Sequence, residues 1–251
     1  MSFTDKVVIV TGASSGIGAA TAVVFAKEGA NLVIVGRNED RLNKVAEQCA
    51  SSGNQPLIVK ADMTNDDDVK KIVTDTIEKF GKIDVLVNNA GMSVSGSILN
   101  GDLLKAYDET LAVNLRAVVH LTALATPHLV ETKGNIINIS SIAGKMVTTS
   151  LSLPYSISKA AIDHFTRGAA LELAPSGVRV NSVSPGPVKT DFFDNAGTVI
   201  SWEIIASRIP LKRCSEPEEV GDIILYLASD KAKGITGSDF VCDNGGLLKI
   251  G

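Results

Sequence analysis

The sequence is short of cysteine, of excess basic charge and of long apolar runs, and each shortage excludes a class of protein. Three cysteines stand far apart among 251 residues, at Cys49, Cys214 and Cys242. An odd, scattered set argues against a disulfide framework and against a zinc site, so we expect no metal. It fits reduced thiols in an intracellular protein, and we expect a cytoplasmic location. A catalytic cysteine stays open as an alternative to buried, inert thiols.

The charge and the apolar pattern narrow the class further. The formal net charge is −4 and no cluster of Lys and Arg stands out, which disfavours nucleic-acid binding because phosphates require a basic face. Charged or turn residues break every apolar run well short of a membrane span, and the N-terminus lacks the apolar region of a signal peptide. With 45% hydrophobic and 21% charged residues, the composition is that of one large globular domain.

Short β-branched runs alternate with amphipathic stretches along the first 180 residues or so. The runs predict strands, and the amphipathic stretches, for example 19–29, 38–50 and 66–81, predict helices. Asn38 precedes two acidic residues as a helix cap, and Gly29 and Gly81 follow last turns as helix ends. The predicted strands are 6–10, 31–35, 56–60, 84–88, 135–140 and 178–183.

Because the strands are apolar almost throughout, helices should cover both faces of a parallel sheet. We therefore predict an α/β protein: a single-domain, Rossmann-like, doubly wound parallel sheet over residues 1–251. The mixed pattern at about 187–210 predicts a substrate lid with short helices.

A glycine-rich loop, TGASSGIG at 11–18, lies between the first predicted strand and the first helix. A tight strand-to-helix turn there lets the backbone approach a pyrophosphate at a helix N-terminus. The spacing is GxxxGxG and not GxGxxG, so an ordinary turn stays an alternative. The residues predicted to contact a dinucleotide are Gly12, Ser14, Ser15, Gly16, Ile17 and Gly18.

The end of the second strand indicates which dinucleotide is bound. An NAD site would place an acidic residue about twenty positions after the glycine loop, but Gly36 stands there and Arg37 follows. A guanidinium can bind a 2′-phosphate with two hydrogen bonds, so we predict NADP(H), with NAD(H) less favoured, and include Asn38 in this site. The alternative is that Arg37 is a solvated loop residue.

Six motifs in order carry a family resemblance: TGASSGIG, NNAG at 88–91, VNLRA at 113–117, NISS at 138–141, YSISK at 155–159 and SPGPVKT at 184–190. With these motifs together, the sequence resembles the short-chain dehydrogenase/reductase family over essentially the whole chain. The resemblance is to the NADP(H)-linked reductases of that family in particular. The resemblance implies catalytic roles for Asn114, Ser141, Tyr155 and Lys159. For the serine, the neighbour Ser140 is the alternative, since only one of two adjacent strand residues can reach the site.

Residues four apart share a helix face, so Tyr155 and Lys159 should point into one site. We expect the Lys159 ammonium to lower the tyrosine pKa, which makes Tyr155 a usable acid or base. The resemblance implies that Tyr155 protonates a carbonyl oxygen that Ser141 polarises, that Lys159 holds the nicotinamide ribose, and that Asn114 positions a water. An exposed Tyr/Lys pair is the alternative for Tyr155 and Lys159, and an asparagine that bridges backbone groups is the alternative for Asn114.

Further cofactor contacts are implied at the ends of the later strands, where open α/β sheets bind ligands. Asp62 is expected at the adenine, although a turn residue ahead of Thr64 is the alternative. The other positions are Met63, Asn89, Ala90, Gly91, Pro185, Gly186, Val188 and Thr190, with Tyr155 and Lys159 also in contact with the cofactor.

The expected function is NADP(H)-dependent interconversion of a hydrophobic ketone or aldehyde and its alcohol. The expected substrate walls are mostly apolar or small: 92–98, 146–153 and the aromatic residues Phe192, Phe193 and Trp202. The alternatives are a 3-oxoacyl-carrier-protein reductase-like enzyme and a non-catalytic NADP(H)-binding protein. The resemblance also implies a homotetramer, with a dimer second.

Overall fold

Within the described residues, seven parallel strands form one sheet in the order β3-β2-β1-β4-β5-β6-β7. The computed structural model describes residues 2–147, 149, 152–195 and 201–248. The strands are β1 (Val7–Thr11), β2 (Asn31–Gly36), β3 (Leu57–Lys60), β4 (Val85–Asn88), β5 (Asn135–Ile139), β6 (Arg179–Pro185) and β7 (Asp239–Cys242). Six agree with the predicted runs to within about two residues at each end, and β7 was not predicted.

Strand β1 lies inside the sheet, paired with β2 on one side and β4 on the other. The sheet therefore grows outward in two directions from β1, and the connections reverse between β1 and β4. In open α/β sheets, the carboxyl ends of the strands at such a reversal leave a crevice that binds ligands. The fold thus places the glycine loop after β1 and the NNAG segment after β4 at a binding crevice.

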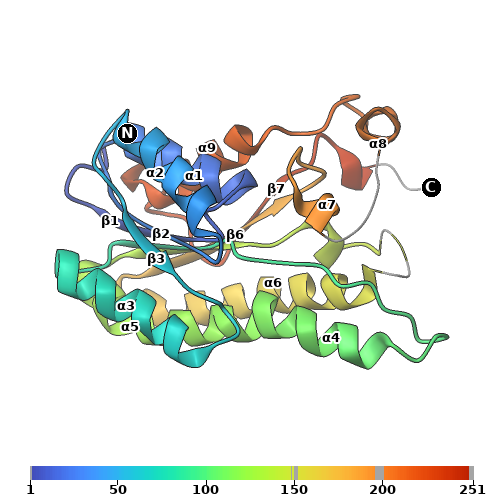
Figure 1. The fold of residues 1–251 in the computed structure, drawn as a ribbon, viewed down its shortest axis with the longest axis horizontal. Coiled ribbons are helices and arrows are strands. Elements are labelled where there is room, and N and C mark those ends of the chain that lie inside the picture. The colour runs from blue at the N-terminus through green and yellow to red at the C-terminus, as the bar shows by residue number, and fades with distance from the viewer. Residues whose placement is uncertain (1, 148, 150–151, 196–200, 249–251) are drawn as a thin grey trace.

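Helices cover both faces of the sheet, as Figure 1 shows. One layer contains α1, α2 and α9, and the other contains α3, α4, α5 and α6. Each layer closes a separate apolar core over the buried strand residues, one including Phe25 and Ile224, the other Ile72 and Leu121. The helices are α1 (Gly16–Lys27), α2 (Glu39–Ala50), α3 (Asp66–Phe80), α4 (Leu103–Leu111), α5 (Ala117–Thr132), α6 (Leu153–Leu173), α7 (Phe192–Asn195), α8 (Trp202–Arg208) and α9 (Pro217–Ala228).

Local chemistry sets the helix ends. Asn38 accepts a hydrogen bond from the Arg41 amide at the start of α2, which confirms the predicted cap. Gly81 ends α3 with φ 74°, a left-handed conformation that glycine adopts without strain, which confirms it as a helix end. The fold class predicted from alternating strands and helices is confirmed.

One of the described segments departs from regular α-helix. Residues Ala112–Arg116, between α4 and α5, form a π-helical turn that carries Asn114.

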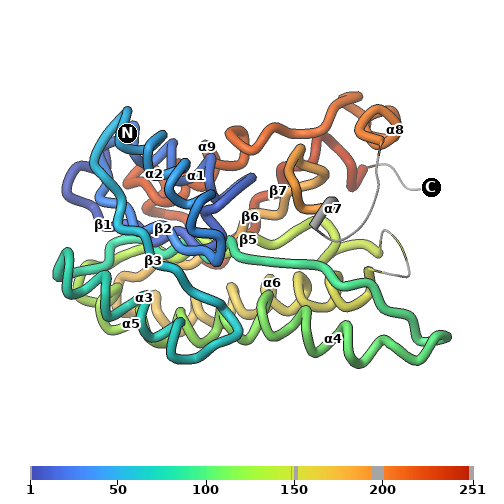
Figure 2. Tube along the Cα trace, in the orientation of Figure 1, coloured from blue at the N-terminus to red at the C-terminus, as the bar shows by residue number. Residues whose placement is uncertain are grey.

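The segment expected as a lid contains α7 and α8, which lie at one end of the molecule in Figure 2. Phe192 of α7 contacts Tyr155 near the start of α6. The part of the expected lid at 196–200 lies outside the described residues. In the described part of the chain, the structure has no helix with the length and apolar character that a membrane crossing needs.

Candidate active site

One cavity of about 550 Å³ collects most of the predicted site residues. It lies at the carboxyl ends of β1 to β6, and its walls come from the loops that follow those strands. Of the predicted cofactor and catalytic residues, all of which lie in the described part of the chain, only Gly18, Asn38 and Asn114 are not in its lining. Segments far apart in the sequence therefore meet in one place, as the doubly wound fold requires.

The glycine loop forms a cradle that side chains would fill. Gly12 and Gly16 have φ of 66° and 55°, in the left-handed region that favours glycine. A Cβ on Gly12 would stand 2.8 Å from the Ala90 Cα, and a Cβ on Gly16 would stand 2.9 Å from the Thr190 methyl. The bare backbone beside the N-terminus of α1 fits a dinucleotide pyrophosphate.

Side chains of β1 and of the segment after β4 hold this loop in place. The Asn89 side-chain Nδ2 donates hydrogen bonds to the carbonyl oxygens of Thr11 and Gly12, at 2.9 and 3.2 Å. The Thr11 hydroxyl oxygen accepts from the backbone amides of Asn89 and Ala90, both at 3.0 Å. Thr11 was not predicted, although its place at the last position of β1 could have indicated it.

Arg37 and Asp62 lie at the far end of the cavity, after β2 and β3. Arg37 is exposed. Hydrogen bonds from the Thr64 amide and hydroxyl to Asp62 Oδ1, at 2.9 and 2.8 Å, are the main causes of the lowered pKa of Asp62, and the charge of Arg37 makes a smaller contribution. The turn alternative for Asp62 is therefore present in the structure, and the residue lines the cavity as well.

Two of the three residues absent from the lining act on the site's framework. Gly18 packs beneath the glycine loop, where a Cβ would stand 2.3 Å from the Gly12 oxygen. Asn38 is occupied in capping α2.

Asn114, the third, sits in the π-helical turn and is buried. Its Oδ1 accepts from the Met92 amide and its Nδ2 donates to the Met92 oxygen, both at 2.8 Å. The same Nδ2 donates to the Ser158 hydroxyl at 3.0 Å. The structure shows an asparagine that bridges backbone groups, and this bridging can coexist with the expected catalytic role of Asn114, which stays a prediction.

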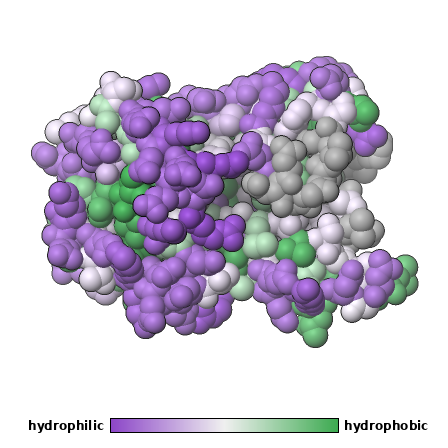
Figure 3. Space-filling view, viewed as in Figure 1, coloured by the Kyte–Doolittle hydropathy of each residue, from purple (hydrophilic) through white to green (hydrophobic). Residues whose placement is uncertain are grey.

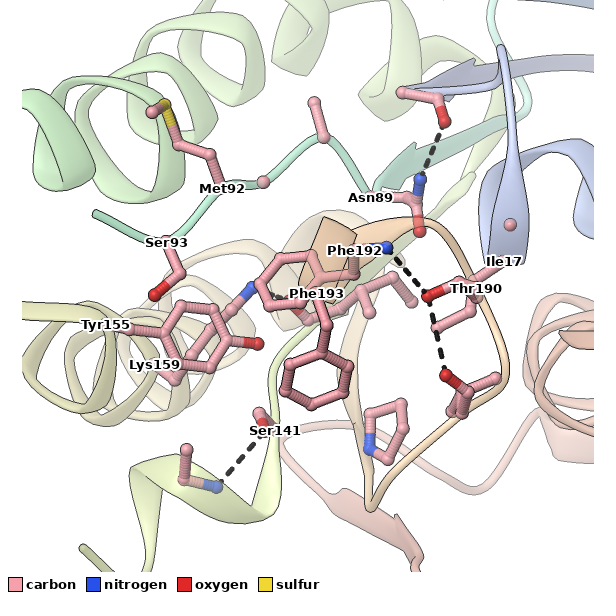
Figure 4. Close-up of a pocket in the computed structure, with 18 of the residues that line it drawn as sticks. Ile17, Asn89, Met92, Ser93, Ser141, Tyr155, Lys159, Thr190, Phe192 and Phe193 are labelled. Atoms are coloured by element: carbon pink, nitrogen blue, oxygen red, sulfur yellow. Dashed lines mark hydrogen bonds between the residues drawn. The ribbon is translucent and has the colours of Figure 1, made fainter. Parts of the chain in front are cut away.

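Tyr155 and Lys159 lie on one face of α6, as their spacing predicts, and both line the cavity with Ser141 (Figure 4). The Tyr155 hydroxyl lies near Ser141, which opposes the larger effect of burial and lowers the Tyr155 pKa in part. The Lys159 ammonium donates to the Ile139 oxygen at 2.7 Å and lies 5.5 Å from the centre of the Tyr155 ring. The hydroxyls of Tyr155 and Ser141 and the ammonium of Lys159 therefore lie in the same part of the cavity.

The structure corrects the expected direction of the Tyr155 pKa. Burial raises it to about 12, and the hydrogen bond with Ser141 lowers it only in part. Burial also lowers the pKa of Lys159 to about 8, against a smaller opposing effect of Asp163. The ammonium, 5.5 Å from the centre of the Tyr155 ring, does not overcome the desolvation of the phenolate. Tyr155 is therefore protonated at neutral pH.

The two adjacent serines after β5 have different environments. The buried Ser140 donates its hydroxyl to the Lys159 carbonyl oxygen at 3.2 Å, so it ties the strand end to α6. Ser141 accepts from the Ala143 amide at 3.1 Å and faces Tyr155 across the cavity (Figure 4). The geometry therefore favours Ser141 over Ser140 as the serine that meets a substrate.

The half of the cavity away from the glycine loop has mixed walls. Phe192 packs 5.4 Å from the Tyr155 ring and 5.9 Å from Phe193, whose ring lies 5.8 Å from that of Trp202. Ser93 and Ser95 supply hydroxyl groups from the segment after β4. Of the expected wall at 146–153, Thr149 and Ser152 line the cavity, while 148, 150 and 151 lie outside the described residues.

Several lining residues were not predicted individually, although some lie inside the quoted motifs. They are apolar or small and lie within two residues of a predicted position: Val113, Ile139, Ile142, Ala143 and Pro187. Their contribution is shape and backbone, which a motif does not display.

Comparison with known proteins identifies the family. A family model described as enoyl-(acyl carrier protein) reductase matches residues 12–246. The meso-2,3-butanediol dehydrogenase of Serratia marcescens is 36% identical, with 100% of this chain and 98% of that protein covered. The 3-oxoacyl-[acyl-carrier-protein] reductase FabG of Thermotoga maritima is 34% identical, with 98% and 99% covered.

Among solved structures, a short-chain dehydrogenase/reductase of unknown function from Caenorhabditis elegans, with cofactor, has a TM-score of 0.94 and 40% identity, with 99% of this chain and 97% of that chain covered. The chain is an oxidoreductase of the α/β nucleotide-binding class. It belongs to the short-chain dehydrogenase/reductase family, whose members bind a nicotinamide cofactor and act on small molecules.

Proposed function

We propose that the protein is an NADP(H)-dependent oxidoreductase that interconverts a hydrophobic ketone or aldehyde and its alcohol. The observation that carries the proposal is the convergence of Ser141, Tyr155 and Lys159 in a cavity whose other half is a glycine cradle. Such a cavity can hold a dinucleotide and a small substrate against one acid–base group.

The proposed chemistry divides between cofactor and protein. A bound nicotinamide cofactor supplies or accepts the hydride. The Tyr155 hydroxyl, protonated because burial raises its pKa to about 12, donates its proton to the carbonyl oxygen during reduction. Ser141 donates a hydrogen bond to the same oxygen and stabilises its developing charge. Lys159 holds a positive charge beside the Tyr155 ring, and this charge favours the phenolate left after proton transfer.

The preference for a hydrophobic carbonyl compound rests on Phe192, Phe193 and Val113 in the wall near Tyr155. The hydroxyls of Ser93 and Ser95 make that wall less apolar than the sequence suggested. A 3-oxoacyl thioester remains the second candidate, because FabG of T. maritima is a relative over nearly the whole chain. Turnover of a 3-oxoacyl thioester well above that of a free lipophilic ketone would favour the second candidate.

NADP(H) specificity is tested by replacing Arg37 with alanine. Hydrogen bonds to charged groups contribute about 1.5–3 kcal/mol, so we expect NADPH affinity to fall by about tenfold to a hundredfold and NADH affinity to change little. Titration followed by cofactor fluorescence measures both. Lys44→Ala, an exposed cation farther along α2, is the matched control and should bind both cofactors as the wild type does. Equal loss of NADPH and NADH affinity in Arg37→Ala would remove the argument for a 2′-phosphate site.

The pH dependence of carbonyl reduction is expected to follow Lys159. Because burial lowers the pKa of Lys159 to about 8, its positive charge is present at neutral pH and is lost as the pH rises through about 8. Tyr155 stays protonated across the same range. The rate at saturating NADPH should therefore be level near neutrality and fall above pH 8, as measured by NADPH oxidation. A rate that instead rises through this range would contradict the assigned roles.

Self-association as a homotetramer, with a dimer second, belongs to the same proposal. Exposed apolar side chains on α4, α5 and α6 support it, among them Leu104, Val119 and Leu171. Figure 3 shows hydrophilic residues over most of the face in view. In the segment before α4, Ile98 and Leu99 are 72% and 96% exposed. Such side chains gain free energy when a second copy covers them.

A further inference from the structure

A lysine that no motif includes lies just after the Ser141 turn. Lys145 follows the short 3-10 turn Ile142–Gly144, and its ammonium lies 2.9 Å from Asp163 Oδ2 and 2.7 Å from Asp239 Oδ2. Asp163 is on α6 and Asp239 begins β7. One cation therefore joins the turn to a helix and to a strand.

Both carboxylates are fixed by burial or by further bonds. Asp163 is 6% exposed, and its Oδ1 has no hydrogen-bond partner among the described residues, so Lys145 is the group that balances its charge. Asp239 Oδ1 accepts the hydroxyls of Ser182 and Ser184 at 2.7 and 2.6 Å. Burial lowers the pKa of Lys145, but the hydrogen bonds and charges of Asp239 and Asp163 together outweigh that effect, so the pKa is raised and the ammonium stays charged.

The ion pair of Lys145 with Asp163 continues a series of contacts that includes the proposed catalytic residues. In this series, called the ladder below, residues of α6 meet the chain at and after the end of β5. Tyr155, Lys159 and Asp163 stand at intervals of four on α6, so they share a face at steps of about 6 Å. Each contacts the end of β5 or the segment that follows it: Tyr155 meets Ser141, Lys159 meets the Ile139 oxygen, and Asp163 meets Lys145. The backbone between the rungs is already close, since a Cβ on Gly144 would stand 2.9 Å from the Lys159 carbonyl carbon.

We propose that Lys145 is a positioning residue for the reaction: its ammonium, held by Asp163 and Asp239, fixes the turn that carries Ser141 against the helix that carries Tyr155 and Lys159. The kinetic part of this inference rests on the proposed carbonyl reduction. The geometric and electrostatic part does not, because it concerns groups of the free protein.

The ladder predicts changes in the pKa of Lys159 that a merely structural role of Lys145 would not produce. The groups around Lys159 are Tyr155 and Asp163 on its own helix, the Ile139 carbonyl of β5 and the neutral Asn114 near Gly91, and Lys145 is linked to Lys159 through Asp163. Asp163 raises the pKa of Lys159. Removing Lys145 leaves Asp163 unbalanced, so the pKa of Lys159 should rise, whereas removing the Asp163 charge should lower it.

The first experiment therefore follows the titration of Lys159 by NMR of protein with isotope-labelled lysine side chains, with the signal assigned by its loss in Lys159→Met. Lys145→Met should move the Lys159 pKa up and Asp163→Asn should move it down. Lys145→Arg, which keeps the charge, should leave it near the wild-type value. Lys71→Met, which removes the cation of an exposed ion pair with Asp75 on α3, is the matched control and should not move it.

The second readout is kinetic. In Lys145→Met we expect kcat to fall by about tenfold to a hundredfold, as a small misplacement of Ser141 predicts, with KM nearly unchanged and with recovery in Lys145→Arg. If Lys145→Met does not fold, Asp163→Asn and Lys145→Arg still give different expectations for the Lys159 titration, a lowered pKa in the first and an unchanged pKa in the second. Shifts of the same sign in Lys145→Met and Asp163→Asn, or no shift in Asp163→Asn, overturn the proposal. Shifts as expected in a wild-type protein that reduces no carbonyl compound would refute the proposed function and leave the ladder intact.

Discussion

Tyr155→Phe is expected to lose carbonyl reduction almost completely while keeping its fold and its cofactor. A positioned acid contributes about 100-fold to 10,000-fold to the rate, and kcat should fall by that amount. Phenylalanine retains the ring that packs 5.4 Å from Phe192 and lies 5.5 Å from the Lys159 ammonium, so it removes only the hydroxyl that Ser141 contacts. Steady-state NADPH oxidation measures the loss, and fluorescence titration measures NADPH binding.

Tyr226→Phe on α9 is the matched control, since Tyr226 is 37% exposed and outside the cavity lining. It removes the same hydroxyl group from the same residue type and should keep the wild-type kcat. If Tyr155→Phe retained more than about a tenth of the wild-type kcat, Tyr155 could not be the proton donor.

Gly18→Ala should abolish cofactor binding although alanine normally stabilises a helix by about 1 kcal/mol relative to glycine. The added Cβ would stand 2.3 Å from the Gly12 oxygen and 2.5 Å from Asn89 Nδ2. Neither atom can move away without breaking other contacts. The Gly12 oxygen belongs to the backbone, and the Asn89 side-chain amide is hydrogen-bonded to the Thr11 and Gly12 oxygens. The glycine loop must move, and the cradle for the pyrophosphate is lost. We expect NADPH affinity to fall by at least about a hundredfold, a loss of about 2.7 kcal/mol.

Gly168→Ala provides the matched control within a helix. Gly168 lies in α6, and a Cβ there would meet nothing within 4 Å. This variant should raise the free energy of unfolding by about 0.5–1 kcal/mol and leave NADPH affinity unchanged. Calorimetry and the same titration compare the two variants. Wild-type affinity in Gly18→Ala would show that the loop adapts and that the cradle argument is wrong.

The fold was predictable because its signals are local and repeated. Runs such as VVIV and LVIV have no polar face, which requires helices on both sides of a parallel sheet. Asn38 and Gly81 mark helix ends through their own backbone preferences, so their positions held in the structure. Strand β7 was missed because its four residues, DFVC, are too few and too mixed to stand out from a turn-rich stretch.

The meeting of Ser141, Tyr155 and Lys159 in one cavity was also predictable, from helix spacing and from the family resemblance. The direction of the Tyr155 pKa was not, because it depends on how much water burial removes and on where the ammonium points. A sequence shows that a lysine is four residues away, but it does not show that its proton is directed at the Ile139 carbonyl oxygen.

Asn114 and Lys145 show a second limit, which is three-dimensional context. The π-helical turn at Ala112–Arg116 determines that the Asn114 amide bonds Met92 and Ser158, and no residue of VNLRA announces that turn. The sequence does not indicate the partners of Lys145, because Asp163 and Asp239 lie 18 and 94 residues later and only the fold brings them to it. Long-range ion pairs of this kind leave no pattern in a single sequence.

The central claim is that this cavity transfers hydride between NADP(H) and a lipophilic carbonyl compound. The most direct test incubates the protein with a panel of lipophilic ketones and aldehydes and NADPH that carries deuterium at the transferable position, and analyses the alcohols by mass spectrometry and NMR. We expect an alcohol with one deuterium on the former carbonyl carbon, formed by the wild type and not by Tyr155→Phe. NADPH that binds with no labelled alcohol from any compound of the panel, or labelled alcohol formed equally by Tyr155→Phe, would contradict the central claim.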